Sequence, residues 1–492
     1  MKQIKILLRT SLLLLIIYLL LMIPDREPSS VQTAEAEPFA WNMNERWKTL
    51  EGEFSRLKML NPSVLDSLEI SRRTSLTILF NQLQQNSPIE INDERLSQLL
   101  NQFFEWSPVV AASNKSEVYI EQYNSIRNFI KAQSRHWNIN KPAQRATLYT
   151  LLYGMRAATE EVLLQADTIN FNPVQHVTDE PSATPSATIQ GITVHSGDLF
   201  VSRGGAEVSA FISRGNDYPG NFSHVALLHV DETGKPSFIE AHIEKGVAIA
   251  TAEEYLKDRK LRFMVLRPRA DLPQVLNNPM LPHQSAQIAL EETKRRHIPY
   301  DFKMDFYDSA AMFCSEVGSF AYRQYGLNLW KAESTISSAG TAKWLNTFGV
   351  ENFVTQMPSD LEYDPQLSIV AEWSDPETLM KDHIDNAVMD ALLERANAGM
   401  EISYNALLLP VARIVKGYSI LQNKLGKPGI IPEGMSATRA LKNNSFVDIY
   451  QEVKIHTEQK IAAFIEKNGY RPPYWQMVGF ANEIVNTIHK QS

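Results

Sequence analysis

The sequence predicts an α+β domain in the middle of the chain, with an all-α domain on each side. Changes in the apolar pattern indicate this arrangement. Apolar residues recur at helical spacing over 38–167, take a period of two from Ile192, and return to helical spacing from Ser374. Strands beside helices in one stretch are typical of an α+β domain. We therefore predict a central domain at 191–373 and a helical C-terminal domain at 374–492.

The N-terminal helices are interrupted by prolines, which favour turns, at Pro62, Pro88 and Pro108. The following stretch, 168–190, combines further prolines with Ser, Thr and Ala. That composition is typical of a linker between domains.

The central domain shows alternating apolar residues bounded by turn residues. The strands expected from this pattern are Leu199 to Val201, Phe222 to Val230, Ser237 to Ile243, Gly246 to Ile249, Arg262 to Leu266 and Gln366 to Ala371. The second and third strands flank a turn sequence, Asp231 to Lys235, and are expected to form a hairpin. Two helices are expected, at about Gln284 to Arg296 and from Cys314 to Gly326.

The C-terminal domain is expected to begin with a capping box, in which Ser374 and Glu377 satisfy the first turn of a helix. Near its end lies an aromatic cluster of Tyr470, Tyr474 and Trp475. We expect these rings to be part of a core.

The N-terminus has the pattern of a targeting segment. Three basic residues precede an unbroken apolar run from Leu12 to Ile23, and acidic residues follow it. This charge order predicts that the N-terminus stays inside and the rest is exported to a periplasmic or extracytoplasmic compartment. We expect residues 1–24 to be a signal peptide or a signal anchor, which would hold residues 4–23 in the inner membrane.

The overall charge argues against a nucleic-acid partner. The formal net charge is −8 and the pI is about 5.8, whereas nucleic-acid binding usually needs a basic face. The chain has a single cysteine, so no zinc-type cysteine spacing is present.

That cysteine, Cys314, lies at the expected start of a helix. Free N–H groups and the helix dipole favour a thiolate at such a position. An odd cysteine in an exported protein is either a reactive thiol or an intermolecular bridge.

A base and an orienting group are available upstream. His224 begins a predicted strand, and Glu240 and His242 lie two residues apart on the neighbouring one, so they share a face. Either Glu240 or His242 is placed to bind the far nitrogen of His224, as the third member of a catalytic triad does.

Five short motifs follow one another along the central domain, and their order is typical of a known family. They are Gly197-Asp198-Leu199, Phe222-Ser223-His224-Val225, Phe238-Ile239-Glu240-Ala241, Pro299-Tyr300-Asp301-Phe302 and Phe313-Cys314-Ser315-Glu316-Val317. Over roughly residues 190–372 this order resembles the YiiX/YaeF-like permuted papain-like cysteine amidases. That family is related to NlpC-type peptidases and, distantly, to lecithin:retinol acyltransferase. The histidine precedes the cysteine here, whereas the ordinary papain-like order is the reverse.

The resemblance implies a permuted papain-like central domain with an antiparallel sheet. It implies Cys314 as the nucleophile, His224 as the general base and Glu240 as the orienting group. His242 stays an alternative third member, because the acyltransferase relatives use a second histidine. Tyr300 and Asp301 are expected to shape the substrate cleft, although both also suit a loop-packing role.

The expected reaction is acyl transfer through an acyl-enzyme, which needs no metal or organic cofactor. The first hypothesis is an exported cysteine amidase or peptidase acting on cell-envelope peptides. A second keeps the fold but acts on lipids, as a lipid amide or ester hydrolase or an acyltransferase. A third is a non-catalytic binding or scaffold protein with a relict thiol.

Overall fold

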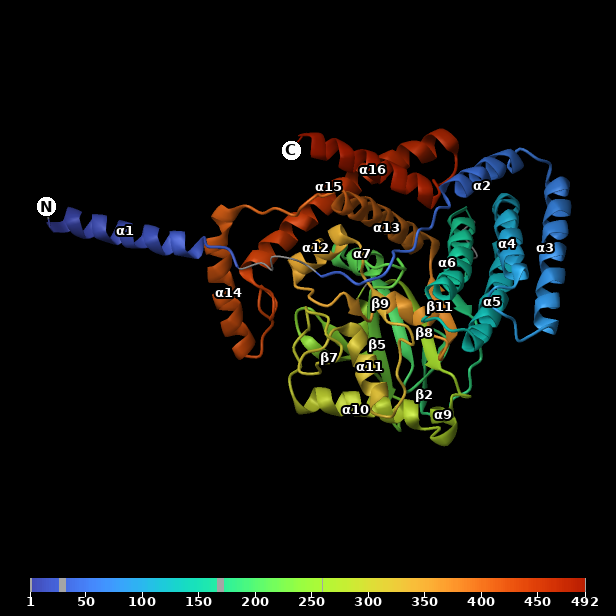
Figure 1. The fold of residues 1–492 in the computed structure, drawn as a ribbon, viewed down its shortest axis with the longest axis horizontal. Helices are drawn as coiled ribbons and strands as arrows, with labels where there is room; N and C mark the ends of the chain where they lie inside the picture. Colours follow the sequence, from blue (N-terminus) through green and yellow to red (C-terminus); the bar gives the residue numbers. More distant parts are fainter. Residues whose placement is uncertain (1, 26–31, 166–171, 259, 492) are drawn as a thin grey trace.

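The computed structural model describes residues 2–25, 32–165, 172–258 and 260–491 (Figure 1). A seven-stranded sheet lies at the centre, with strand order β1-β11-β8-β4-β5-β6-β7, and every neighbouring pair is antiparallel. In that order the strands are β1 (Val174–His176), β11 (Leu367–Ser374), β8 (Lys260–Pro268), β4 (Leu199–Gly204), β5 (His224–Val230), β6 (Pro236–His242) and β7 (Gly246–Thr251). The predicted α+β centre with helical flanks is confirmed.

Two small two-stranded sheets accompany it. They pair β2 (Ser186–Ile189) with β3 (Ile192–His195), and β9 (Ser334–Thr335) with β10 (Val354–Thr355). The helices of this region are α7 (Glu207–Arg214), α8 (Ala252–Lys257), α9 (Pro273–Asn277), α10 (Leu281–Arg295), α11 (Cys314–Arg323), α12 (Ala339–Phe348) and the 3₁₀ helix η3 (Pro358–Tyr363).

The two faces of the sheet are covered differently. Successive side chains of a strand point to opposite faces, and β4 shows this clearly. Leu199 and Val201 pack with α10 and α11, whereas Phe200 packs with Tyr255 of α8 and with the β2–β3 ribbon. The packing of α11 against β5 and β6 brings the start of α11 to the central strands.

The N-terminal helices stand side by side at one end of the sheet (Figure 1). They are α2 (Asn44–Leu57), α3 (Pro62–Gln85), α4 (Glu94–Ser113), α5 (Ser116–Gln133), the 3₁₀ helix η1 (Ser134–His136) and α6 (Pro142–Gln165). Pro62 begins a helix, but Pro108 lies inside α4 and is buried there. The expected interruption at Pro108 is therefore wrong. Burial of its neighbours Trp106 and Val109 offsets the hydrogen bond that a proline removes from a helix.

Part of the stretch expected to be a linker pairs with strands. Residues 174–176 form the edge strand β1 against β11, and residues 186–189 form β2. Residues 168–171 lie outside the described residues. Main-chain pairing at a sheet edge needs no apolar run, which is why the composition did not indicate these strands.

The C-terminal helices are α13 (Pro376–Asn397), the 3₁₀ helix η4 (Ala406–Leu408), α14 (Leu409–Lys424), α15 (Ala437–Asn468) and α16 (Tyr474–Gln491). The residue that caps α13 is Asp375, whose side chain accepts hydrogen bonds from the N–H groups of Glu377 and Thr378 at 2.9 and 3.3 Å. The predicted cap at Ser374 is wrong, because Ser374 is still the last residue of β11.

The first helix, α1 (Lys2–Leu21), projects away from the body of the molecule beside α14 (Figure 1). The hydroxyl of Tyr18 donates to the carbonyl of Leu407 at 2.9 Å. None of the helices in the described part of the chain is both long enough and apolar enough to cross a bilayer.

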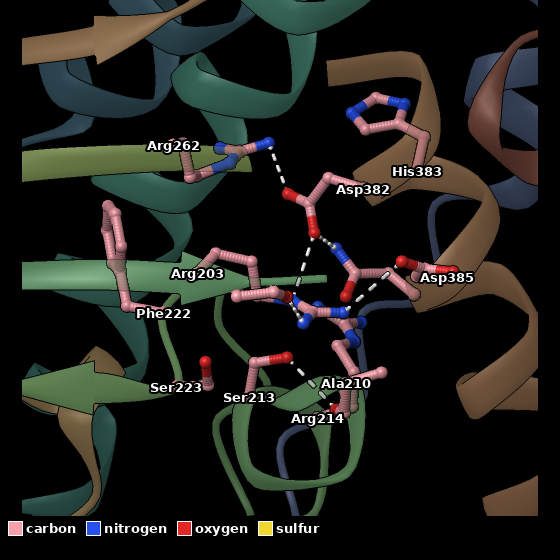
Figure 2. A network of polar contacts seen from close by, with 12 residues as sticks. Arg203, Ala210, Ser213, Arg214, Phe222, Ser223, Arg262, Asp382, His383 and Asp385 are labelled. Atoms are coloured by element: carbon pink, nitrogen blue, oxygen red, sulfur yellow. Dashed lines mark hydrogen bonds and ion pairs between the residues drawn. The ribbon is translucent and has the colours of Figure 1, made fainter. Parts of the chain in front are cut away.

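Buried ion pairs join the sheet to both sets of helices. Figure 2 shows the carboxylate of Asp382, on α13, between the guanidinium groups of Arg203 on β4 and Arg262 on β8. The two ion-pair distances are 3.1 and 2.7 Å, and all three side chains are at most 1% exposed. Arg262 also pairs with Glu160 on α6, which binds His383 of α13 at 2.8 Å. These contacts fix α6 and α13 to the central strands.

Candidate active site

Cys314 is the first residue of α11, as the sequence predicts. It is 4% exposed, and its Sγ lies 3.9 Å from the carbonyl oxygen of Ser223. The backbone N–H of Val225 lies close enough to the sulfur to lower the pKa of the thiol. The thiol is therefore held between the start of α11 and the start of β5.

His224 is the first residue of β5, and Glu240 lies on the adjacent strand β6 of the predicted hairpin. The His224 Nε2 is 2.7 Å from Glu240 Oε2, and the His242 Nε2 is 3.0 Å from Glu240 Oε1. One carboxylate thus binds both histidines. Because Nε2 of His224 is engaged by Glu240, Nδ1 is the nitrogen left for the hydrogen bond with Cys314.

The thiol and the imidazole change each other's protonation. Burial alone lowers the pKa of His224, but its hydrogen bonds with Cys314 and Glu240 outweigh burial and raise that pKa to about 9. Burial raises the pKa of the Cys314 thiol, yet the hydrogen bond and charge of His224 bring it below its ordinary value. This pair favours a thiolate beside an imidazolium.

The third group is held in its charged form. Burial raises the pKa of Glu240, but hydrogen bonds from His224 and His242 lower it well below its ordinary range. The Glu240 side chain is 3% exposed, against 19% for His224 and 30% for His242. The two histidines are therefore the more exposed members of this group, and Glu240 lies behind them.

The two expected cleft residues take different positions. Tyr300 is half-buried and lies close enough to Cys314 for the cysteine to raise the tyrosine pKa, which burial already raises well above its ordinary value. Asp301 turns into its own loop, where its carboxylate accepts hydrogen bonds from the N–H groups of Lys303 and Asp305 at 2.8 and 2.7 Å. The structure thus brings Tyr300, and not the carboxylate of Asp301, to the thiol.

Glu316 lies two residues after Cys314 and is fully buried. Burial, with the nearby Asp301, raises the pKa of this carboxyl to about 9, so Glu316 is neutral at pH 7. The one sequence signal for its burial is its position one helical turn before Phe320, in the apolar run of α11.

The arrangement has the parts for nucleophilic acyl transfer: a thiol at a helix start, an imidazole against it, and a carboxylate behind the imidazole. Within the described ranges, no three side chains of the types His, Cys, Asp and Glu are grouped so as to hold a metal ion.

Comparison with known proteins agrees with this chemistry. Residues 193–371 match the family described as permuted papain-like amidase enzyme, YaeF/YiiX, C92 family. A search of curated proteins found no match. A crystal structure of the metalloprotein YiiX from Escherichia coli O157:H7 aligns at 19% identity and a TM-score of 0.29, covering 36% of this chain and 97% of that one.

Proposed function

We propose that this chain is an exported enzyme that cleaves amide bonds in cell-envelope peptides, and the match of residues 193–371 to the permuted papain-like amidase family supports this proposal. The family match supports a cysteine amidase, as the motifs predict. The proposal assigns the roles within the site, the compartment and the substrate class.

In the proposed mechanism Cys314 is the nucleophile. Its thiolate attacks the carbonyl carbon of the scissile amide, and the backbone N–H of Cys314, at the start of α11, helps to hold the oxyanion. His224 donates a proton to the leaving amine as the C–N bond breaks, which leaves a thioester. His224 then takes a proton from water, which attacks the thioester and releases the acid and the thiolate.

One observation carries this assignment: the hydrogen-bonded series Cys314, His224 and Glu240. Glu240 fixes the Nε2 side of the imidazole at 2.7 Å and stabilises its protonated form. The pKa of His224 near 9 means that the thiolate–imidazolium pair persists from the lowered pKa of Cys314 up to about pH 9.

The first test is the rate at which iodoacetamide alkylates Cys314 between pH 4 and 9. We expect a reactive thiolate well below the ordinary cysteine pKa of roughly 8.5. Removing the imidazole with His224→Ala leaves burial to dominate, so the thiol pKa should rise and alkylation at neutral pH should slow. His229→Ala is the matched control, because His229 lies on the same strand but binds Gln287 at 2.6 Å. Equal alkylation profiles in the His224→Ala and wild-type proteins would remove His224 from the mechanism.

The substrate is tested separately. Wild type is expected to release amines from envelope stem peptides, while Cys314→Ala, folded by circular dichroism, is expected to release none. Hydrolysis by the alanine variant at the wild-type rate would contradict the nucleophile assignment.

A lipid substrate is the second candidate, and His242 is the observation that favours it. This second histidine binds the other oxygen of Glu240 at 3.0 Å, and its ring centre lies 5.8 Å from that of His224. Turnover of acyl lipid amides or esters, with envelope peptides left intact, would support this candidate against the first.

Export is proposed from the basic and then apolar order of residues 1–24. Fractionation of cells that make the full chain is expected to place it outside the cytoplasm, either in the inner membrane or as a shortened soluble form. Recovery of an intact chain from the cytoplasm would contradict export.

A further inference from the structure

A cavity lies away from the thiol, where α2 and the chain segment before it meet α6, α13 and α16. Its volume is about 640 Å³, within the roughly 300–1,000 Å³ of small-molecule sites. Tyr474 and Trp475, which the sequence indicated as core, line it. We refer to it below as the α6–α13–α16 cleft.

Aromatic rings form much of its wall. Tyr149 and Tyr153 of α6 are stacked, with ring centres 4.9 Å apart and an interplanar angle of 9°. Trp41 meets Tyr153 edge-on at 5.6 Å, and Trp475 is half-buried at the start of α16. Tyr149 is buried, whereas Trp41, Tyr153 and Trp475 are half-buried and leave apolar ring surface for a ligand.

The charged groups that line the cleft already have counter-charges. Asp390 accepts hydrogen bonds from Nε and Nη2 of Arg214 at 2.7 and 2.8 Å, and from the hydroxyl of Tyr474 at 2.7 Å. Arg156 pairs with the carboxylates of Glu160, Glu362 and Glu372. Glu160 pairs in addition with Arg262 and His383. These pairs leave no strong net charge for an ionic ligand to neutralise.

The other charged residues that line the cleft do not give it a net charge either. Glu45 and Lys48 are exposed, and their charges are opposite. Burial raises the pKa of Glu161 to about 7, so this carboxyl is about half neutral at pH 7. The cleft therefore suits an uncharged ligand.

Polar atoms of the lining are nevertheless unsatisfied. Among the described residues, Nδ1 of His383, Oδ1 of Asn386 and Nε1 of Trp475 are buried and have no hydrogen-bond partner. His383 and Asn386 are 4% and 2% exposed. Nε2 of His383 binds Glu160 at 2.8 Å, so Nδ1 is the ring nitrogen that has no partner. The amide oxygen of Asn386 accepts a hydrogen bond and the N–H groups of Trp475 and Arg156 donate, so these atoms match a ligand that can both donate and accept.

We propose that the α6–α13–α16 cleft binds a neutral saccharide. A sugar ring has an apolar face of C–H groups that stacks on aromatic rings. Its hydroxyls both donate and accept, which matches the unsatisfied His383, Asn386 and Trp475 atoms. This inference does not rest on the proposed amidase reaction.

The cleft is joined to the catalytic histidine by a short piece of chain. Pro219 and Asn221 line the cleft, and His224 follows three residues after Asn221. Arg214 donates to the carbonyl of Gly220 at 3.2 Å, and the hydroxyl of Tyr149 donates to the carbonyl of Pro219. A saccharide in the cleft would lie against the segment that leads into β5.

The test uses the full chain and two uncharged probes, cellobiose and N,N′-diacetylchitobiose. Binding is measured by calorimetry and by the change in tryptophan fluorescence. Trp475→Phe keeps a ring but loses the Nε1 donor, so we expect about fivefold weaker binding from the loss of one hydrogen bond. Trp373→Phe is the matched control, since Trp373 stacks on Phe263 of the central sheet, outside the cleft, and its change should leave affinity unaltered.

Saturation-transfer NMR on the wild-type protein checks binding without any variant. Absence of saccharide binding by both methods would overturn the proposal, and so would binding that Trp475→Phe leaves unchanged. Binding of tetramethylammonium or decanoate in place of both sugars would also overturn it, in favour of a cationic or acyl ligand. Cys314→Ala is expected to bind the sugars like wild type, so loss of the amidase assignment and loss of this one are distinguishable.

Discussion

Glu240 is the residue on which the protonation of the site depends. Its carboxylate receives hydrogen bonds from His224 and His242, one on each oxygen. It raises the pKa of His224, and the protonated His224 in turn lowers the pKa of Cys314. A substitution at Glu240 is therefore expected to change the pKa of the Cys314 thiol through its effect on His224.

Glu240→Gln is expected to reduce amide hydrolysis more than His242→Gln does. Loss of the carboxylate removes a group that raises the pKa of His224, so that pKa should fall from about 9. The imidazolium is then lost at lower pH, and the alkaline limb of the pH–rate profile should move to lower pH. The pH dependence of kcat/KM for the three proteins measures this shift. A larger loss in His242→Gln would transfer the orienting role to His242.

At the level of elements, local patterns predicted the parts of the site well. The β5–β6 hairpin and the helix that begins at Cys314 follow from apolar spacing and turn residues close in sequence. The strand β1 and the passage of α4 through Pro108 did not follow, because both depend on tertiary contacts. The same holds for the burial of Glu316, which lies near Asp301 of the preceding loop.

Gly246 begins β7, directly after the turn from β6 and beside the site. Its replacement is expected to lower both the stability of the protein and its activity. Its φ is +73°, and a Cβ there would lie 2.1 Å from the carbonyl oxygen of Ile298, which binds the N–H of Val247 at 2.9 Å. Gly246→Ala should cost about 1 kcal/mol for the left-handed backbone and about 1–3 kcal/mol more for the clash. It should also lower kcat/KM, because Ile298 leads into the Tyr300 loop.

The matched control for Gly246→Ala is Gly191→Ala. Gly191 has a φ of +79° with nothing within 4 Å of an added Cβ, so it has the backbone strain without the clash. Urea denaturation and amide hydrolysis measure both variants. Equal losses of unfolding free energy in the two variants would mean that the Ile298 carbonyl moves aside without destabilising the protein, and would contradict the predicted clash.

At the scale of the whole molecule, the helical flanks and the sheet form one buried unit. Arg203, Arg262, Glu160 and Asp382 come from β4, β8, α6 and α13, and all four are buried together. Sequence reasoning did not find this network, since no local pattern pairs charges separated by a hundred or more residues. Its consequence is that the stability of the catalytic sheet depends on a helix outside the matched family segment.

Asp382→Asn tests this dependence, because asparagine keeps the size of the side chain and removes its charge. Two buried guanidinium groups then lose their shared carboxylate, which should cost about 3–5 kcal/mol of unfolding free energy. Glu483→Gln makes the same chemical change in an exposed pair with Lys460, where the side chains are 66% and 42% exposed, and should cost less than about 1 kcal/mol. Urea denaturation monitored by fluorescence gives both values, and the reactivity of Cys314 toward iodoacetamide reports on the site during unfolding.

If α13 belongs to the same cooperative unit as the sheet, the Cys314 transition and the fluorescence transition should shift together in Asp382→Asn. A shift in fluorescence alone would mean that the catalytic sheet folds without α13.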